Sequence, residues 1–231
     1  MTSRVLGIAA TVSLMLSAGG AHAANPITNG GFETPVVPVG NFTNFDVGST
    51  TLTGWTVTGP SAGANVSIVS GTFTQGGVSF ESQSGSQWLD LTGDGSNTTE
   101  GVSQAVSTTP GHEYALTFYI GNTTGGGIFG TTSTVNLFVN GSETAFTNST
   151  ASPTDLNWKQ FTDRFVATGT STTLLFQNGD PGNDNSNGLD NIVLSDMGAV
   201  TTSVPEPATL ALFCLGLAGV GFSRRRTLIR S

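Results

Sequence analysis

The sequence is poor in cysteine and in charged residues. Its 231 residues include one cysteine, Cys214, and charged residues make up only 10% of the chain. Cys214 lies in an apolar stretch near the C-terminus, so the rest of the chain can form no disulfide, cysteine nucleophile or thiolate metal site. Glycine is abundant, with 32 residues, but lacks the period of collagen. This composition favours a turn-rich β-protein with one sizeable domain.

Basic residues are also scarce, and they are unevenly distributed. Between Ala24 and Ser203 the only ones are Lys159 and Arg164, whereas fourteen of the fifteen acidic residues lie in that segment. A segment this acidic cannot neutralise a phosphate backbone, so we expect no nucleic-acid partner. Calcium ions or neutral sugars are better suited to it.

The first 23 residues have the pattern of a secretory signal peptide. Arg4 precedes an apolar stretch over residues 5–18, and the small residues Ala21 and Ala23 then form a signal peptidase cleavage pattern. We therefore predict a signal peptide over residues 1–23 and a mature chain that begins near Ala24. The expected partners at this stage are the Sec translocon and signal peptidase.

The C-terminal region combines a short motif, an apolar stretch and an arginine cluster. Residues 208–222 are almost wholly apolar, and as a helix they would reach about 22 Å, so arginine side chains must extend the reach toward the ~30 Å hydrocarbon core. We predict a transmembrane helix at 208–222, with the arginines on the cytoplasmic side and the preceding domain outside. Residues 198–203 are predicted to be a linker. The motif and cluster residues are Pro205, Glu206, Pro207, Arg224, Arg225 and Arg226.

This combination resembles the PEP-CTERM sorting signal of Gram-negative bacteria, over residues 204–230. In that family an exosortase, a membrane cysteine protease, cuts near the Pro-Glu-Pro motif and releases or re-anchors the protein. The resemblance implies export across the inner membrane as a membrane-anchored precursor, followed by a final location at the cell surface or outside the cell. Because family members commonly accompany exopolysaccharide production, extracellular polysaccharide is an expected partner.

The segment between the two ends has the pattern of β-structure. In residues 113–120, Tyr114, Leu116, Phe118 and Ile120 alternate with smaller or polar residues, which predicts a strand with these four side chains in the core. Asn140-Gly141 predicts a type I′ hairpin turn. We predict an all-β fold, an antiparallel β-sandwich of the jelly-roll type, over residues 24–197. The other expected strands span residues 54–58, 66–69, 87–91, 102–106, 134–139, 143–146, 159–167, 172–177 and 189–194.

Several short motifs in this segment resemble those of the galactose-binding-like jelly rolls, which include carbohydrate-binding modules and the DUF642 proteins of plant cell walls. The resemblance implies that the first and last strands lie side by side, and that Glu33 and Asp190 hold a structural Ca²⁺. The alternative is that both are ordinary polar residues at strand ends. The motifs are Asn29-Gly30-Gly31-Phe32-Glu33, Gly54-Trp55, residues 111–121 and residues 188–194, where Asn191 and Ile192 replace the usual Asp and Val.

Sugar-binding modules often present an exposed aromatic ring beside a hydrogen-bonding side chain. Leu89 and Leu91 should face the core, which places Trp88 and Asp90 on the opposite face of their strand as candidate sugar-binding residues. The alternative is that Trp88 packs beneath a neighbouring loop.

We predict no catalytic residue, because His112 follows a turn and no nucleophile or zinc motif accompanies it. The predicted function is a non-enzymatic carbohydrate-binding protein that contributes to an exopolysaccharide or biofilm matrix. The alternatives are a purely structural matrix protein without a defined sugar ligand and a cryptic polysaccharide hydrolase.

Overall fold

A computed structural model describes residues 25–94, 98–127, 129–182 and 186–200. The predicted signal peptide and the predicted sorting signal at 204–231, with its apolar helix, lie outside these residues. Within the described ranges, no helix is long and apolar enough to cross a membrane.

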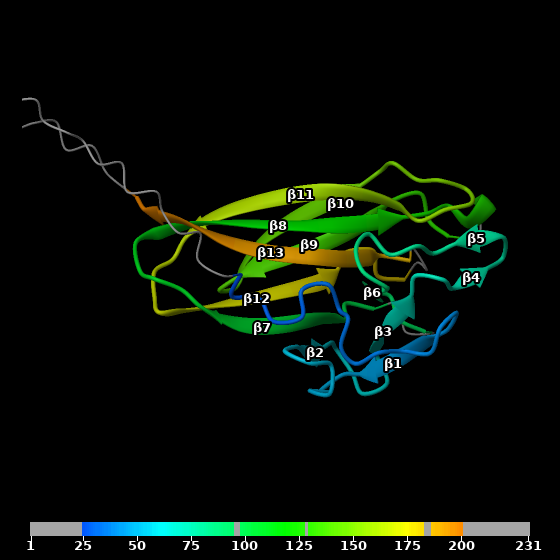
Figure 1. The fold of residues 1–231 in the computed structure, drawn as a ribbon, viewed down its shortest axis with the longest axis horizontal. Helices are drawn as coiled ribbons and strands as arrows, with labels where there is room; N and C mark the ends of the chain where they lie inside the picture. The colour runs from blue at the N-terminus through cyan, green and yellow to red at the C-terminus, as the bar shows by residue number, and fades with distance from the viewer. Residues whose placement is uncertain (1–24, 95–97, 128, 183–185, 201–231) are drawn as a thin grey trace, which may run out of the picture.

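Two antiparallel sheets face each other and enclose the main core (Figure 1). The first sheet has six strands in the order β1-β3-β6-β13-β8-β11, and the second has five in the order β10-β9-β12-β7-β2. The hairpin β4-β5 forms a separate two-stranded sheet. The prediction of an all-β jelly-roll sandwich is therefore confirmed. The strands are β1 Phe42–Asp46, β2 Thr56–Thr58, β3 Asn65–Ser70, β4 Thr74–Gln75, β5 Val78–Ser79, β6 Gln87–Asp90, β7 Gly101–Ser107, β8 His112–Asn122, β9 Ser133–Val139, β10 Ser142–Asn148, β11 Asn157–Val166, β12 Ser171–Asn178 and β13 Gly188–Ala199.

Strand alternation builds the main core as the sequence predicts. Tyr114, Leu116, Phe118 and Ile120 of β8 are all buried in it. Phe118 makes an edge contact with Phe176 of the opposite sheet, with the ring centroids 5.3 Å apart. Such aromatic contacts join the two sheets, and they add to the stabilisation that comes from burying apolar area.

The hairpin between β9 and β10 turns at Asn140 and Gly141, which have φ angles of 49° and 86°. Both angles are positive, as a type I′ turn requires, and Asn and Gly adopt them at low cost. This turn was predicted from the residue pair alone.

Strand β13 lies at the centre of the first sheet, between β6 and β8. It extends to Ala199, which pairs with His112, so the predicted linker does not begin at residue 198 as expected. The N-terminal segment lies beside the same strand, because Ile192 donates its backbone N–H to the Gly30 carbonyl at 2.9 Å. The N-terminal segment and the last strand are thus neighbours. The first strand, β1, is separated from β13 by β3 and β6, so the implied pairing of the first and last strands is not observed.

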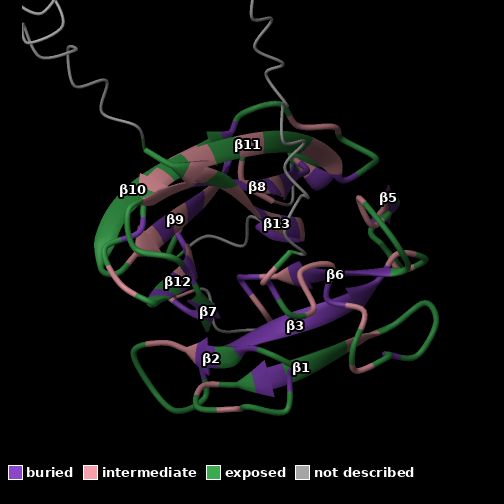
Figure 2. Cartoon of the chain, turned by 60° about the vertical axis from the view of Figure 1, so that its left-hand side comes forward, coloured by how far each residue is buried: buried purple, intermediate pink, exposed green. Residues whose placement is uncertain are grey.

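Three strands, β1, β4 and β5, were not predicted. β4 and β5 have two residues each, which is too short to show alternation, and the turn between them uses Gly76 and Gly77 at positive φ. This hairpin covers part of the outer face of the first sheet, so β3 is buried on both faces and is purple throughout in Figure 2. A second apolar cluster forms there, which we call the outer cluster. It consists of Val69, Val78, Phe80, Trp88 and Leu156.

Candidate functional site

The outer cluster borders a hollow of about 120 Å³ on the outer face of the first sheet. We call this hollow the aromatic pocket. It is open to solvent and combines aromatic side chains with hydroxyl and carboxylate groups. The residues that line it are Phe42, Ser67, Val69, Phe73, Gln75, Phe80, Trp88, Asp90, Gly93, Asp94, Phe129 and Ser186.

Trp88 and Asp90 both line this pocket, on the face of β6 opposite the buried Leu89. Trp88 is nevertheless only 1% exposed, so the expectation of an exposed ring is wrong and the alternative, that Trp88 packs beneath a neighbouring segment, is the one observed. Phe80 stacks on the Trp88 ring at 6.2 Å, and the Trp88 Nε1–H donates to the Phe80 carbonyl at 3.0 Å. The segment after β5 therefore covers Trp88. The Trp88 ring forms the floor of the pocket and does not present an exposed face for a sugar to stack on.

Three partly buried phenylalanines, Phe42, Phe73 and Phe129, form the rim of the pocket. Phe42 and Phe73 meet edge to face at 5.5 Å, and Phe129 makes an edge contact with Phe80 at 6.0 Å. The sequence analysis missed all three. Phe73 and Phe80 flank the Gly76-Gly77 turn, and this short symmetrical pattern is the one signal that could have placed Phe73 beside Phe80.

The cover over the outer face is fixed by hydrogen bonds from distant parts of the chain. Ser79 of β5 donates its N–H to the Thr154 carbonyl at 2.8 Å, and its own carbonyl accepts the N–H of Leu156. The Trp158 Nε1–H donates to the Glu81 carbonyl at 2.9 Å. These bonds pre-form the pocket and hold its aromatic wall in place.

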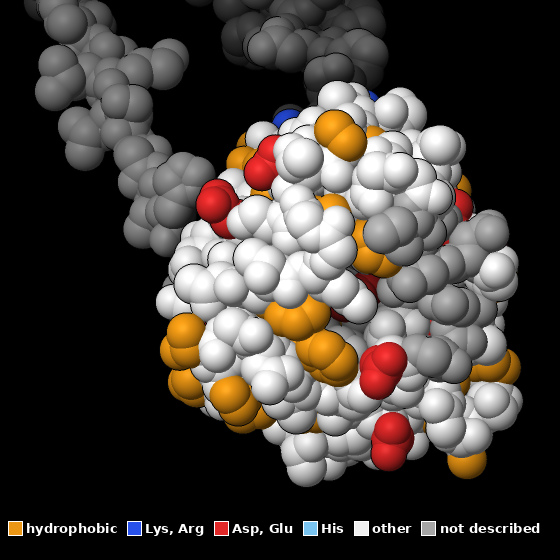
Figure 3. Space-filling model, turned by 90° about the vertical axis from the view of Figure 1, so that its right-hand side faces the viewer, with side chains coloured by type: hydrophobic (Ala, Val, Ile, Leu, Met, Phe, Trp, Pro, Cys, Tyr) orange, Lys and Arg blue, Asp and Glu red, His pale blue; other side chains and the backbone are white. Residues whose placement is uncertain are grey.

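The polar side of the pocket is built from β3, β6 and the loop that follows β6. Asp90 Oδ1 accepts hydrogen bonds from the N–H and the hydroxyl of Thr92, and Ser67 donates its hydroxyl to Asn44 Oδ1 at 2.7 Å. Asp94 is exposed, and its N–H donates to Asn65 Oδ1 at 2.9 Å. Figure 3 views the end of the molecule where β4 and β5 lie, where acidic side chains are exposed near hydrophobic ones. This arrangement can bind a ligand that has an apolar face and a hydrogen-bonding edge.

Glu33 and Asp190, the predicted calcium ligands, both contact the segment between β5 and β6. Asp190 is fully buried, and its Oδ2 accepts the N–H groups of Gln83 and Ser84 at 3.0 Å each. Glu33 Oε1 accepts the N–H groups of Ser86 and Gln87. The structure therefore brings both carboxylates to one segment.

The hydrogen bonds and the burial of Asp190 affect how readily its carboxylate could bind a cation. Its Oδ1 also accepts the N–H of Asn191 at 2.7 Å, so three N–H groups direct positive charge at this carboxylate. Burial nevertheless raises the pKa of Asp190 to about 7, with a small further rise from the nearby Glu33 charge. In the described part of the chain, no three His, Cys, Asp or Glu side chains are grouped as a metal site. Ca²⁺ at this pair stays a prediction.

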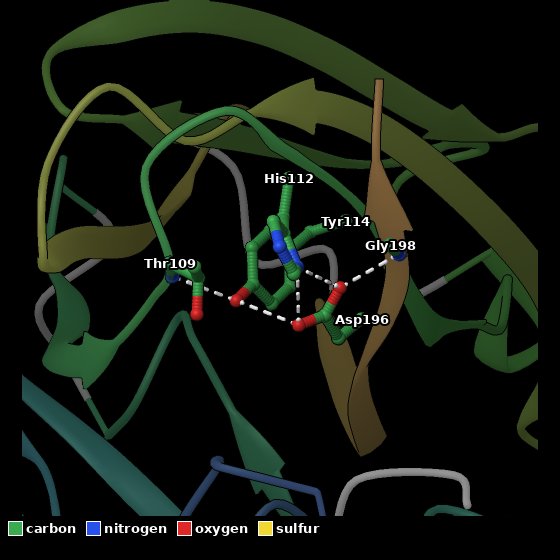
Figure 4. Close-up of polar contacts among 5 residues, drawn as sticks. All are labelled: Thr109, His112, Tyr114, Asp196 and Gly198. Atoms are coloured by element: carbon green, nitrogen blue, oxygen red, sulfur yellow. Dashed lines mark hydrogen bonds and ion pairs between the residues drawn. The ribbon is translucent and has the colours of Figure 1, made fainter. Parts of the chain in front are cut away.

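A second polar cluster joins β8 to the end of β13 (Figure 4). His112 Nδ1 lies 2.9 Å from both carboxylate oxygens of Asp196, and the Tyr114 hydroxyl donates to Asp196 Oδ2 at 3.2 Å. Gly198 donates its N–H to Asp196 Oδ1 at 2.8 Å, and the Tyr114 hydroxyl accepts the N–H of Thr109. These bonds lower the pKa of Asp196, with the Gly198 N–H as the largest cause.

This cluster contains the histidine and the carboxylate of a catalytic triad, but only these two parts. In the hydrogen bonds of the described residues, His112 contacts Asp196 through Nδ1, and no hydroxyl nucleophile is bonded to the other ring nitrogen. The arrangement fastens the last residues of β13 to the start of β8. His112, which the sequence analysis placed directly after a turn, is the first residue of β8.

Comparison with known families identifies both parts of the chain. Residues 25–194 match the model of DUF642, described as a protein of unknown function, and residues 203–226 match the PEP-CTERM protein-sorting motif. The first match covers well over half of the sequence, so the chain belongs to the DUF642 family. The second implies export and a membrane-anchored precursor that an exosortase processes. Its motif and arginine residues, and the predicted cleavage residues Ala21 and Ala23, lie outside the described residues.

Solved structures of carbohydrate-binding modules share the sandwich architecture. TmCBM61, solved in complex with β-1,4-galactotriose, is 20% identical with a TM-score of 0.43, and the match covers 74% of this chain and 98% of that one. The CBM22-1 xylan-binding domain of Paenibacillus barcinonensis Xyn10C is 16% identical with a TM-score of 0.41, over 71% of this chain and 99% of that one. Likenesses this remote carry no argument about ligand or activity. No curated protein matches the sequence.

Proposed function

We propose that this protein is a non-enzymatic carbohydrate-binding protein that acts at the cell surface or in the extracellular matrix of a Gram-negative bacterium. In this proposal the DUF642 domain binds extracellular polysaccharide, and the PEP-CTERM segment directs the chain through the inner membrane to its exosortase. The observation that carries the proposal is the aromatic pocket on the outer face of the first sheet.

Sugar rings have apolar faces formed by C–H groups and edges formed by hydroxyl groups. A pocket that binds them combines aromatic surface with a few polar groups in fixed positions. The aromatic pocket has both, with Phe42 and Phe73 at the rim and Asp90 and Ser67 on the polar side. Its volume of about 120 Å³ is below the ~300–1,000 Å³ of most small-molecule pockets, which argues for contact with one sugar ring rather than with a long oligosaccharide segment.

The test is retention of the full-length chain, purified in detergent, on extracellular polysaccharide from the same organism. Phe73→Ala should abolish retention, because it removes a rim ring that packs against Phe42 and Phe80. Phe161→Ala is the matched control, since Phe161 is also a partly buried phenylalanine but packs against the main core. Retention should survive in this control.

Two results would contradict the proposal. The absence of retention in the wild-type chain would favour a purely structural matrix protein. Release of reducing sugar by the wild-type chain would favour a polysaccharide hydrolase, for which Asp90 and Asp94 are the first residues to replace because both carboxylates line one pocket.

A further inference from the structure

The described residues that line the aromatic pocket include two acidic side chains. Asp90 and Asp94 line it, and its described lining residues include no lysine, arginine or histidine. In Figure 3, the blue of lysine and arginine is visible only at the upper margin of the face. A ligand in this pocket therefore meets carboxylates, and no cationic side chain, along the described lining.

The two basic residues of the segment have other neighbours. Lys159 directly follows Trp158 in β11, but its ammonium group lies 5.2 Å from the centroid of the Phe161 ring, which packs against the main core. Arg164 Nη1 lies 3.3 Å from Glu113 Oε2. Arg164 is six residues along β11 from Trp158, whose ring contacts Trp88 at 5.9 Å. At about 3.3 Å per strand residue, the separation of Arg164 from Trp158 is about 20 Å, which is about 2.5 Debye lengths at physiological salt.

The aromatic side chains of the pocket favour a positively charged ligand, as the carboxylates do. The face of an aromatic ring is its negative side and attracts cations such as ammonium groups. Phe80 lies at the centre of this wall, with ring centroids of Phe73, Trp88 and Phe129 at 5.6, 6.2 and 6.0 Å. Phe80 and Trp88 are themselves buried, so the rings that a ligand can reach are the partly buried ones of the rim. Such rings next to carboxylates favour a ligand that joins an apolar ring to a positive charge.

We propose that the aromatic pocket takes a hexosamine unit whose amine is not acetylated and therefore carries a proton. This inference rests on the proposed function, because it names the class of sugar that the same pocket binds. The ammonium group lies against the aromatic faces and the Asp90 and Asp94 carboxylates, and the sugar ring packs on the rim. Uronic acids are excluded, because their carboxylates would face those of the pocket without a base between them.

The experiment compares four oligosaccharides of equal length by calorimetric titration of the full-length chain in detergent. They are a glucosamine oligomer, its N-acetylated counterpart, a neutral β-glucan and an oligogalacturonate. We expect the glucosamine oligomer to bind about tenfold more tightly than the neutral glucan, which is the effect of one cation–π contact with a charge pair. The oligogalacturonate should not bind, and added salt should reduce the preference for the amine.

Four variants separate binding in the pocket from the general attraction of an acidic protein for a cation. Asp94→Asn removes one exposed charge at the pocket and should lower the preference several-fold; its carboxylate accepts one long hydrogen bond, from Asn44 Nδ2 at 3.4 Å. Asp90→Asn would disturb two shorter bonds from Thr92. Asp163→Asn makes the same change in charge on β11, among residues that line a different hollow, and should leave the preference unchanged. Phe73→Ala should abolish binding of every oligomer that the wild-type chain binds.

Each other outcome is decisive. Equal binding of the amine and neutral oligomers, or tighter binding of the N-acetylated one, would overturn the hexosamine inference and leave the proposed function standing. Equal losses in Asp94→Asn and Asp163→Asn would show non-specific charge attraction and would also overturn the inference. If none of the four oligomers nor the organism's own polysaccharide binds, the proposed function itself fails.

Discussion

Asp190 and Glu33 hold the segment before β6 from its two ends. Asp190 Oδ2 accepts the N–H groups of Gln83 and Ser84, and Glu33 Oε1 accepts those of Ser86 and Gln87. Gly85, between these two pairs, has a φ of 65°, and a Cβ added there would overlap Glu33 Oε1. Two carboxylates from opposite ends of the domain thus fix the backbone that leads into the strand of Trp88.

The buried Asp190 should make stability depend on pH. Burial raises its pKa from 3.8 to about 7, so between about pH 4 and pH 7 the folded chain binds more protons than the unfolded chain. Its contribution is fully present below the unfolded pKa and is lost as pH rises through 7, by up to about 4 kcal/mol. Urea unfolding at pH 4.5 and pH 8 measures this loss. The control is Asp190→Asn, which should flatten the difference, and equal pH slopes in both chains would contradict the prediction.

The predicted Ca²⁺ can be tested through the same residue. A cation at Glu33 and Asp190 favours the ionised carboxylates, so Ca²⁺ should raise the melting temperature at pH 8 and a chelator should reverse the gain. Asp190→Asn should show neither effect. If neither Ca²⁺ nor the chelator changed the melting temperature, the two carboxylates would only accept hydrogen bonds from the backbone N–H groups.

The contact between His112 and Asp196 should have the opposite pH dependence. The Gly198 N–H, followed by His112 and Tyr114, lowers the pKa of Asp196. A lowered pKa stabilises the fold above the unfolded value, and this contribution is lost as pH falls through the folded value. Asp196→Asn should therefore reduce the melting temperature at pH 7 more than at pH 3. Equal reductions at the two pH values would assign the effect to packing rather than to charge.

Most strands of the sandwich could be predicted because apolar residues, which face the core, alternate along them with polar residues, which face outward. All four predicted core residues of β8 are buried, and the Asn140-Gly141 turn follows from backbone sterics alone. The pocket could not be predicted in this way. Trp88 is on the predicted face, but its exposure depends on a hairpin whose strands have two residues each and whose position depends on bonds to Thr154 and Leu156. Contacts this distant in sequence leave no local pattern.

Gly30 should be required for the contact between the N-terminal segment and β13. A Cβ added to Gly30 would overlap the carbonyl oxygen of Ile192, which is backbone and cannot rotate away. We expect Gly30→Ala to destabilise the fold by about 1–3 kcal/mol, as overpacking usually does. Gly169→Ala is the control, because its Cβ would meet only ordinary contacts at 3.7 and 3.9 Å. Chemical denaturation should show a change within about 0.5 kcal/mol there, or a small gain. Similar losses in both variants would contradict the prediction.

Replacing Trp88 should lower the stability of the fold more than it lowers the affinity for a ligand. Its side chain is fully enclosed between Phe80 and Trp158, so Trp88→Ala should cost about 3–5 kcal/mol through lost burial and the cavity that remains. Trp88→Phe keeps an aromatic ring but loses the Nε1–H bond to the Phe80 carbonyl, and should cost about 1–2 kcal/mol. Phe42→Ala, at the partly exposed rim, should cost less than Trp88→Ala while weakening binding more than Trp88→Phe does. Urea unfolding and oligosaccharide titration on the same variants measure both quantities. If Trp88→Ala abolished binding without lowering the free energy of unfolding, the ring would contact ligand directly and its enclosure by Phe80 would have to open in solution.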